Sequence, residues 1–283
     1  MKAPFHPLFP AALGAVALVC GGVGWLVAGL RWPGPERGAD GLLELLQANP
    51  TAERPVRQAP RPPQVQPWQS PMATLCPALD ADLLRRMASL RLNPRRIRTD
   101  PSNYGQRFER DAFGNRIDPT PRVVVLHETV YGMESAISTF LTPHPRDEDQ
   151  VSYHTLVGLD GEVVQVLDPS RRAFGAGNSA FQGQWVITNP KVGGSINNFA
   201  LHLSLETPLD GENDGPGHNG YTEAQYDAMA LVLADWMRAY AIPWENITTH
   251  RDVDLGGERA DPRSFDWTAL KSRLIALGVV SPC

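Results

Sequence analysis

The chain has 283 residues, of which 42% are hydrophobic and 20% are charged, and its formal net charge is −5 at pH 7. These proportions are typical of a globular protein, and the acidic balance argues against nucleic acid as the main partner. The three cysteines, Cys20, Cys76 and Cys283, form no C-x-x-C pair, so the sequence contains no zinc-finger signal.

An apolar run, Leu8–Leu30, lies near the N-terminus and contains no charged residue. It is close to the ~20 residues that span a bilayer. Three interpretations remain open: an uncleaved membrane anchor, a cleaved signal peptide, or a lipoprotein segment modified at Cys20. All three place the rest of the chain outside the cytoplasm, in the periplasm or cell envelope. Residues 1–33 are therefore assigned to an anchor or signal segment, with the membrane as an expected partner.

Residues 34–74 contain closely spaced prolines, which favour extended polyproline II over a packed core, so this stretch is predicted to be a linker. Residues 75–120 are interpreted as a basic N-terminal extension of the main domain, with a short helix over Pro77–Leu92 and a loop over Tyr104–Thr120. The basic stretch Arg91–Arg98 is either a solvated face or a contact with an anionic polymer or membrane surface.

From residue 121 to residue 283, strand-like and helix-like patterns alternate, which indicates an α/β domain with a mixed central sheet flanked by helices. Two long Gly-rich loops, Ala173–Asn198 and Leu209–Asn219, interrupt the pattern and are expected to be functional. The clearest helix begins with a capping box formed by Thr222 and Gln225. The predicted strands are Val123–Leu126, Ser152–Val157, Val163–Leu167, Phe199–Leu205 and Ile247–Thr249, and the predicted helices are Ser135–Leu141, Thr222–Tyr240 and Trp267–Leu277.

Side chains that could bind a metal ion or transfer protons lie where the predicted strands end. His127 and His250 each follow a β-rich run, and Asp261 lies in a Gly-rich loop that can fold back onto His250. Two imidazoles and a carboxylate can bind a divalent metal and leave a position open for water, as in catalytic zinc sites. A lone histidine at a strand end is more often structural, so the pattern of all three residues matters. Glu206 ends an apolar strand and could exchange protons beside such a metal.

Five motifs carry a family resemblance: VVLHET, VSYHTLVGLDGEVVQ, HLSLET, ITTHRDVD and RADPRSFDW. In order and spacing they resemble the zinc N-acetylmuramoyl-L-alanine amidases of the type-2 family, which is related to peptidoglycan recognition proteins. The resemblance covers residues 121–277. It implies an amidase fold, a Zn²⁺ cofactor, and peptidoglycan or a muropeptide as the substrate.

The resemblance also implies roles for single residues. The family's metal ligands fall on His127, His250 and Asp261, and its catalytic glutamate falls on Glu206. That glutamate would deprotonate the attacking water and then protonate the departing L-alanine nitrogen.

Three further positions are less simple. A tyrosine that assists in some family members falls on Tyr153. The family's lysine position is Arg259, which can stabilise an oxyanion but is a poor proton donor because it stays charged. The histidine of an A-W-H-A-G-like motif is missing, because Gly175 occupies its position. His154 is interpreted as structural or as supporting a ligand, and no constellation is predicted for His202.

The expected reaction is hydrolysis of the amide bond between N-acetylmuramic acid and L-alanine. One alternative is a peptidoglycan-binding module of the same fold that has lost turnover, and another is an amidase acting on small anhydro-muropeptides during wall recycling. Cys76 and Cys283 bracket the domain, so they form either a disulfide or two free thiols. The sequence leaves the oligomeric state open.

Overall fold

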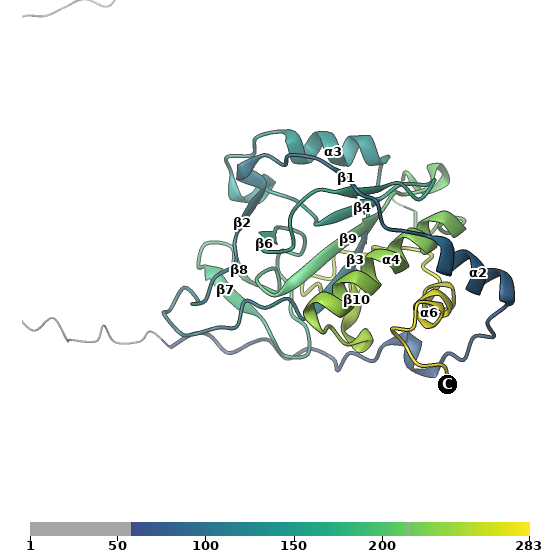
Figure 1. Ribbon diagram of the computed structural model, residues 1–283. Coiled ribbons are helices and arrows are strands. Elements are labelled where there is room, and N and C mark those ends of the chain that lie inside the picture. Colours follow the sequence, from purple (N-terminus) through teal and green to yellow (C-terminus); the bar gives the residue numbers. More distant parts are fainter. Residues whose placement is uncertain (1–57, 214) are drawn as a thin grey trace, which may run out of the picture. The chain divides into compact units, whose positions relative to one another are not determined.

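The computed structural model describes residues 58–213 and 215–283 (Figure 1). The centre of this part is a six-stranded sheet with the strand order β1-β5-β4-β9-β3-β10. Strands β4 and β5 are antiparallel, and all other neighbours are parallel. The predicted mixed sheet is therefore confirmed. Its strands are β1 (Arg95–Arg96), β3 (Val123–Glu128), β4 (Thr155–Val157), β5 (Val163–Gln165), β9 (Ala200–Leu205) and β10 (Ile247–Thr249).

Strand β3 lies between β9 and β10, and all of its residues are buried. Its β-branched valines fit a strand covered on both faces. The strand is longer than the sequence predicts, because it continues through His127 and Glu128. In the parallel register, Val125 lies opposite His202 and His127 lies opposite Ser204. Since alternate residues face opposite sides of a sheet, His127, His202 and Ser204 share one face.

Helices cover both faces of the sheet, as predicted (Figure 1). Helices α2 (Ala81–Ser89), α4 (Glu223–Tyr240) and α6 (Trp267–Ala276) pack with the sheet's leucines and valines in one hydrophobic cluster. Helix α3 (Met133–Leu141) packs on the opposite face against Leu156 and Val164. His127 lies on this second face, where the ring of Tyr153 contacts both His127 and Phe140 of α3.

The helix starts follow the sequence signals closely. Thr222 and Gln225 form both hydrogen bonds of the predicted capping box at the start of α4. The side chain of Asp266 accepts hydrogen bonds from the backbone N–H groups of Thr268 and Ala269 at the start of α6. Helix α2 is shorter than predicted, because Asp80 caps it and sets its beginning at Ala81. Capping side chains satisfy N–H groups that have no partner within a helix.

The loop predicted over residues 173–198 contains regular structure. It begins at the end of β6 (Arg171–Ala173), which pairs with β2 (Tyr104–Gln106), and it includes the hairpin of β7 (Val186–Asn189) and β8 (Gly193–Ser195). These pieces are too short for a clear sequence pattern. The remaining short helices are η1 (Pro71–Thr74), η2 (Pro101–Asn103), η3 (Asp147–Asp149), η4 (Leu209–Gly211), η5 (Trp244–Asn246) and α5 (His250–Val253).

Residues 71–76 dock against α6, although the sequence assigns 71–74 to the linker. Met72 is fully buried in the main core, and Lys271 Nζ on α6 donates to the carbonyl oxygens of Met72 (2.8 Å) and Leu75 (2.5 Å). Cys76 and Cys283 form a disulfide. Of the two alternatives that the sequence leaves open for these cysteines, the structure contains the disulfide.

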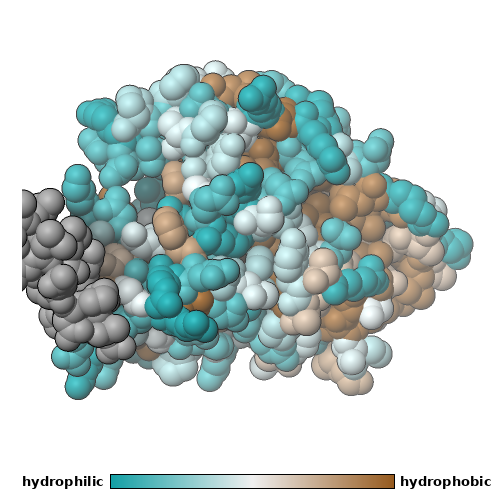
Figure 2. Space-filling model, turned by 60° about the vertical axis from the view of Figure 1, so that its left-hand side comes forward, coloured by the Kyte–Doolittle hydropathy of each residue, from teal (hydrophilic) through white to brown (hydrophobic). Residues whose placement is uncertain are grey.

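The predicted anchor or signal segment, residues 1–33, lies outside the described residues. In the described part, residues 58–213 and 215–283, no helix combines the length and the hydrophobicity that crossing a bilayer requires. In Figure 2, hydrophilic side chains dominate much of the visible surface and hydrophobic ones gather toward the right. Large hydrophobic side chains that are exposed singly are normal on folded proteins and indicate no partner by themselves.

The disulfide gives the first prediction. It links residues that are 207 positions apart, so it strongly restricts the unfolded chain. Replacing both Cys76 and Cys283 by serine should lower the free energy of unfolding by roughly 2–5 kcal/mol. Urea denaturation of the variant and of the oxidised protein measures this difference. Equal midpoints and slopes would show that the crosslink does not stabilise the fold.

Candidate metal centre and its cavity

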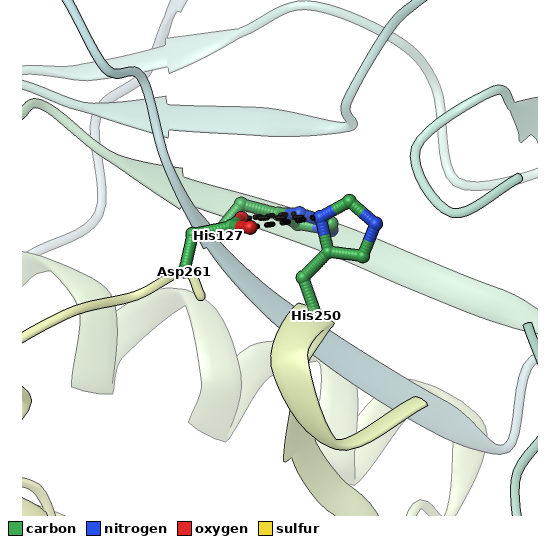
Figure 3. Close-up of side chains that lie close together, drawn as sticks. All are labelled: His127, His250 and Asp261. Atoms are coloured by element: carbon green, nitrogen blue, oxygen red, sulfur yellow. Dashed lines mark hydrogen bonds and ion pairs between the residues drawn. The ribbon is translucent and has the colours of Figure 1, made fainter. Parts of the chain in front are cut away.

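His127, His250 and Asp261 converge at one point (Figure 3). Asp261 Oδ2 lies 3.2 Å from His127 Nδ1, and Asp261 Oδ1 lies 3.1 Å from His250 Nδ1. One potential ligand atom from each residue falls within 4.8 Å of the other two. The spatial convergence predicted from the sequence is therefore present.

Each of the three side chains comes from a different element. His127 projects from β3 in the middle of the parallel strands. His250 opens the short helix α5 directly after β10, whose bounds are those predicted from the sequence. Asp261 lies in the following loop, whose backbone is tied to α5 because Arg251 N–H donates to the Asp261 carbonyl at 3.1 Å. The sheet and a loop bonded to α5 thus hold the three groups.

A second carboxylate shapes the loop that carries Asp261. The Asp254 carboxylate accepts hydrogen bonds from the backbone N–H groups of Gly256, Glu258 and Arg259, at 3.1, 2.7 and 3.1 Å. These bonds lower the pKa of Asp254 even though its partial burial acts in the opposite direction. The Asp254 carboxylate therefore shapes this loop.

The protonation states suit metal binding. Burial lowers the pKa of His127 to about 4, although its hydrogen bond with Asp261 acts in the opposite direction. Burial alone would raise the pKa of Asp261, but hydrogen bonds from His127 and His250 bring the pKa below its ordinary value. At neutral pH the cluster therefore offers a neutral imidazole at His127 and an ionised carboxylate at Asp261, which are the forms that bind metal ions.

The donor set fits a divalent cation such as Zn²⁺. Two imidazole nitrogens and one carboxylate oxygen form a common three-ligand set for catalytic zinc, which keeps a further position for water or substrate. The cluster is largely shielded from solvent, because His127 is fully buried and the Asp261 side chain is only 14% exposed. The residues present therefore fit the metal that the sequence resemblance implies.

A cavity of about 670 Å³ opens over the cluster, and His250 and Asp261 form part of its wall. Tyr153 and Arg259, two of the residues predicted for the site, also line it. The Tyr153 ring stacks on the His127 imidazole with centroids 4.4 Å apart. Burial and the negative charge of Asp261 raise the pKa of Tyr153, so its hydroxyl stays protonated and can donate a hydrogen bond. Both residues are placed to contact a bound molecule.

Arg172, which no sequence pattern predicts for the site, also lines the cavity. Its guanidinium packs over the rings of Phe108 and Phe174 and donates to the Thr188 hydroxyl. No carboxylate within the described residues forms an ion pair with it. Burial lowers the pKa of Arg172 to about 10, so it remains charged at neutral pH. No pattern in the sequence separates this arginine from its neighbours.

The model for the family described as N-acetylmuramoyl-L-alanine amidase (Amidase_2) matches residues 117–264. The chain belongs to this amidase family. The 1,6-anhydro-N-acetylmuramyl-L-alanine amidase AmpD of Salmonella typhimurium is 30% identical over 128 residues, which are 45% of this chain and 59% of that protein. AmpD of Haemophilus influenzae is 27% identical over 172 residues, which are 60% of this chain and 74% of that protein.

Among solved structures, the crystal structure of a selenomethionine derivative of AmpD resembles this chain with a TM-score of 0.48 and 24% sequence identity. The likeness covers 65% of this chain and 96% of that one. The match to the Salmonella typhimurium relative spans about three-fifths of that protein's length. The match to the family model over residues 117–264 is what establishes family membership for this domain.

Glu206 is not brought to the cavity. Its Oε1 accepts a hydrogen bond from Met133 N–H at the start of α3 (2.8 Å), and its Oε2 accepts one from Leu159 N–H (2.9 Å). It is absent from the residues that line the cavity. The carboxylate thus joins α3 to the turn between β4 and β5, which explains why an acid ends this apolar strand. A catalytic role for Glu206 in this amidase domain stays a prediction.

His202 belongs to the site, although the sequence analysis predicts no constellation for it. Its Nδ1 lies 3.0 Å from Nε2 of His127, and both side chains are fully buried. Ser204 lies opposite His127 in the neighbouring strand and is also fully buried. Two polar residues on one face of an otherwise apolar strand are the signal that could have found them, once the strand register was known.

Glu128 anchors a buried polar network at the edge of the cavity. Its carboxylate accepts hydrogen bonds from Tyr221 Oη at 2.6 Å and from Arg263, and it lies 3.2 Å from His218 Nε2. Arg263 also donates to three backbone carbonyls of the 209–219 loop, those of Gly211, Asn213 and Gly215. The network therefore holds this loop in place beside the site, and it gives His218 the constellation that the sequence did not reveal.

The position of Glu206 gives the second prediction. A glutamine at this position keeps one acceptor oxygen but turns an NH₂ group toward a backbone N–H, so Glu206→Gln should lower the free energy of unfolding by about 1–3 kcal/mol. Chemical denaturation of the metal-free protein measures the change. Glu162→Gln is the matched control, because Glu162 forms only a partly exposed ion pair with Arg95. Equal stability of the two variants would remove the structural role of Glu206.

The third prediction concerns pH. Burial lowers the pKa of His154 from 6.5 to about 3, and the charge of Arg107 acts in the same direction. Between these values the unfolded chain binds a proton at His154 that the folded chain does not. Stability therefore falls as the pH is lowered through this window, with a slope of about 1.4 kcal/mol per pH unit from this group.

His154→Asn should remove this part of the slope. Asparagine keeps an acceptor for the backbone N–H of His202, which in the unchanged protein donates to His154 Nδ1 at 3.0 Å. Urea denaturation of the metal-free protein from about pH 7 to about pH 5 compares the two slopes. Parallel curves would show that His154 is not held neutral by burial.

Proposed function

We propose that this chain hydrolyses the amide bond between N-acetylmuramic acid and L-alanine in muropeptides or peptidoglycan. The observation that carries the proposal is the convergence of His127, His250 and Asp261 at the wall of a cavity in a member of the amidase family. The similar proteins from Salmonella typhimurium and Haemophilus influenzae carry the name of an amidase for the anhydro form of this substrate.

The three clustered residues would hold Zn²⁺. When bound, the ion lowers the pKa of a water molecule toward ~7 and polarises the substrate carbonyl. The protein's own contribution is to fix the ligands in a buried site and to surround the reacting carbonyl with donors. Tyr153 can donate its hydroxyl proton in a hydrogen bond, and Arg259 supplies positive charge. Both line the cavity and would stabilise the negative charge that develops on the carbonyl oxygen.

Proton transfer needs a further group, because the water loses a proton and the leaving nitrogen gains one. Glu206 is the residue that the family resemblance implies. To act, its carboxylate has to release the N–H groups of Met133 and Leu159 and turn toward the cavity. Glu128 lines the cavity, but its carboxylate is already paired with Arg263. Movement of Glu206 is therefore part of the proposed mechanism.

The cavity has the charge distribution for a short peptide with acidic groups. Arg172 lies on its wall with no carboxylate partner among the described residues, so it is available to a carboxylate of the stem peptide. The acidic residues of η3, Asp147–Asp149, lie at another part of the wall. They would favour an amino group of the same peptide. Opposite charges at two places would orient the substrate relative to the cluster.

A second candidate function is a zinc-containing module that binds peptidoglycan without cleaving it. The specific observation in its favour is the position of Glu206, whose two oxygens are both occupied by backbone donors outside the cavity. Ser204, the residue paired with the ligand His127, offers no carboxylate in its place. Binding would need the cavity and its arginines but no proton transfer.

We further propose that the domain acts outside the cytoplasm, in the periplasm or cell envelope. The disulfide between Cys76 and Cys283 supports this, because such bonds persist in oxidising compartments. The apolar run Leu8–Leu30 would act as a membrane anchor or a cleaved signal. In that compartment the substrate is either the wall polymer during remodelling or soluble fragments released from it.

The fourth prediction tests activity. Zinc-loaded protein should release free stem peptide from an anhydro-muropeptide, from purified wall polymer, or from both, and mass spectrometry detects the product. Removing the metal with a chelator should stop release. Asp261→Ala should lose activity by a factor of at least about 10², because truncating a ligand removes the metal that drives the reaction. Glu258→Gln is the control, since this exposed residue lies in the same loop.

The outcomes separate the two candidate functions. Zinc binding and retention on wall polymer without any released peptide would support the binding module and overturn the hydrolase. Release by the unchanged protein that persists in a Glu206→Gln variant would keep the hydrolase and remove Glu206 from the mechanism. Comparison of the two substrates also decides between polymer and soluble fragments.

A further inference from the structure

We propose that His202 is a positioning residue for the metal centre, which holds the His127 imidazole in the form that presents Nδ1 to the metal ion. This inference rests on the proposed function, because it takes His127 as a metal ligand. His202 is not one of the three residues that cluster as possible metal ligands. It acts through His127, from the neighbouring strand.

The contact is built into the sheet. His202 Nδ1 lies 3.0 Å from His127 Nε2, and both side chains are fully buried. His202 projects from β9 on the same face as His127, because Val125 is paired with His202 and His127 with Ser204 in the parallel register. The opposite edge of the His127 ring, Nδ1, faces Asp261. The imidazole of His127 is therefore held between a second imidazole and the ligand carboxylate.

The chemistry of imidazole gives this contact its function. When His127 Nδ1 offers its lone pair to a cation, the ring proton must lie on Nε2, and that buried N–H needs an acceptor. His202 Nδ1 is the only atom in the described residues that forms a hydrogen bond with this nitrogen. Without it, the N–H would be buried and unpaired, which disfavours the metal-binding tautomer.

His202 also contacts His154. Its backbone N–H donates to His154 Nδ1 at 3.0 Å, and His154 Nε2 lies 3.2 Å from the carbonyl oxygen of Arg171, to which it can donate. The rings of His154 and His202 are nearly parallel, at 4°. The His202 ring therefore rests against a neighbour whose own tautomer is set by hydrogen bonds.

Gly175 makes room for this ring. A Cβ atom at position 175 would lie 2.5 Å from His202 Nδ1, a contact so short that the ring would have to move. Position 175 is where the sequence resemblance places a motif histidine that this chain lacks. In this structure the imidazole in that space comes from β9 instead. A side chain at position 175 and the His202 ring would therefore compete for the same space.

The arrangement also leaves polar atoms without partners. Within the described residues, His202 Nε2 and Ser204 Oγ are buried and form no hydrogen bond. Buried polar atoms without partners are rare. When His202 Nδ1 accepts from His127, the His202 proton lies on Nε2, so the unpaired N–H is carried by His202 and not by the metal ligand. A histidine there is expected only if its other nitrogen, Nδ1, has a function. The contact with His127 supplies that function.

The experiment measures zinc affinity of the full chain, by competition with a chromophoric chelator, in four variants at two positions. His202→Leu removes the acceptor and should weaken zinc binding about 10- to 100-fold. His202→Gln moves the acceptor away from the Nδ1 position and should do the same. His202→Asn places an oxygen where Nδ1 was and should retain the affinity of the unchanged protein. Gly175→Ala should displace the His202 ring and weaken binding as His202→Leu does.

Thr248→Val is the matched control. Thr248 is fully buried on β10, lies in the same row as Val125 and His202, and its hydroxyl has no partner in the described residues. Its replacement should leave zinc affinity unchanged. Thermal unfolding of each metal-free variant separates a loss of fold from a loss of metal binding. If His202 had a purely structural role, all three His202 variants would be less stable, and their zinc affinities would equal one another.

Equal zinc affinity of His202→Leu and the unchanged protein would overturn the inference. Equal losses in His202→Asn and His202→Leu would also overturn it, because the acceptor would then not matter. If His202→Leu does not fold, the comparison of asparagine with glutamine decides. Failure of the unchanged protein to bind zinc would overturn the proposed function instead, so the two failures are distinguishable.

Discussion

The parallel pairing of β3 with β9 on one side and with β10 on the other is the constraint on which the site depends. It sets His127 within the sheet and brings His202 against it from β9. Strand β10 leads directly into α5, where His250 lies next to His127. A shift of one residue in either pairing would turn these side chains to the opposite face of the sheet. The apolar residues between them prevent such a shift, because they form the core.

Much of this framework follows from the sequence because it depends on local patterns. The valines before His127, the capping residues Thr222 and Asp266, and the order of strands and helices each predict an element that the structure contains. The convergence of His127, His250 and Asp261 is also predictable, since the motif order constrains which segments meet. The boundary was less accurate for α3, which begins at Met133 without a side-chain cap, two residues before its predicted start at Ser135.

The features that the sequence did not reveal depend on strand register and on contacts between distant residues. His202 is two positions from Ser204 in an apolar strand, and nothing local shows that its ring reaches His127. Glu206 looked catalytic because an acid ended a strand, yet its oxygens satisfy the backbone N–H groups of α3 and of the turn after β4. Both cases show a polar group whose partner is supplied by a segment far away in the chain.

The bridge between Cys76 and Cys283 also has a consequence for producing the protein. It holds these residues with their Cα atoms 5.7 Å apart, and Cys76 lies two residues after η1. In a reducing host the bond does not persist, and η1 is then held against α6 by non-covalent contacts alone, those of Met72 and Lys271. An oxidising host is therefore the better choice for obtaining the protein with its full stability.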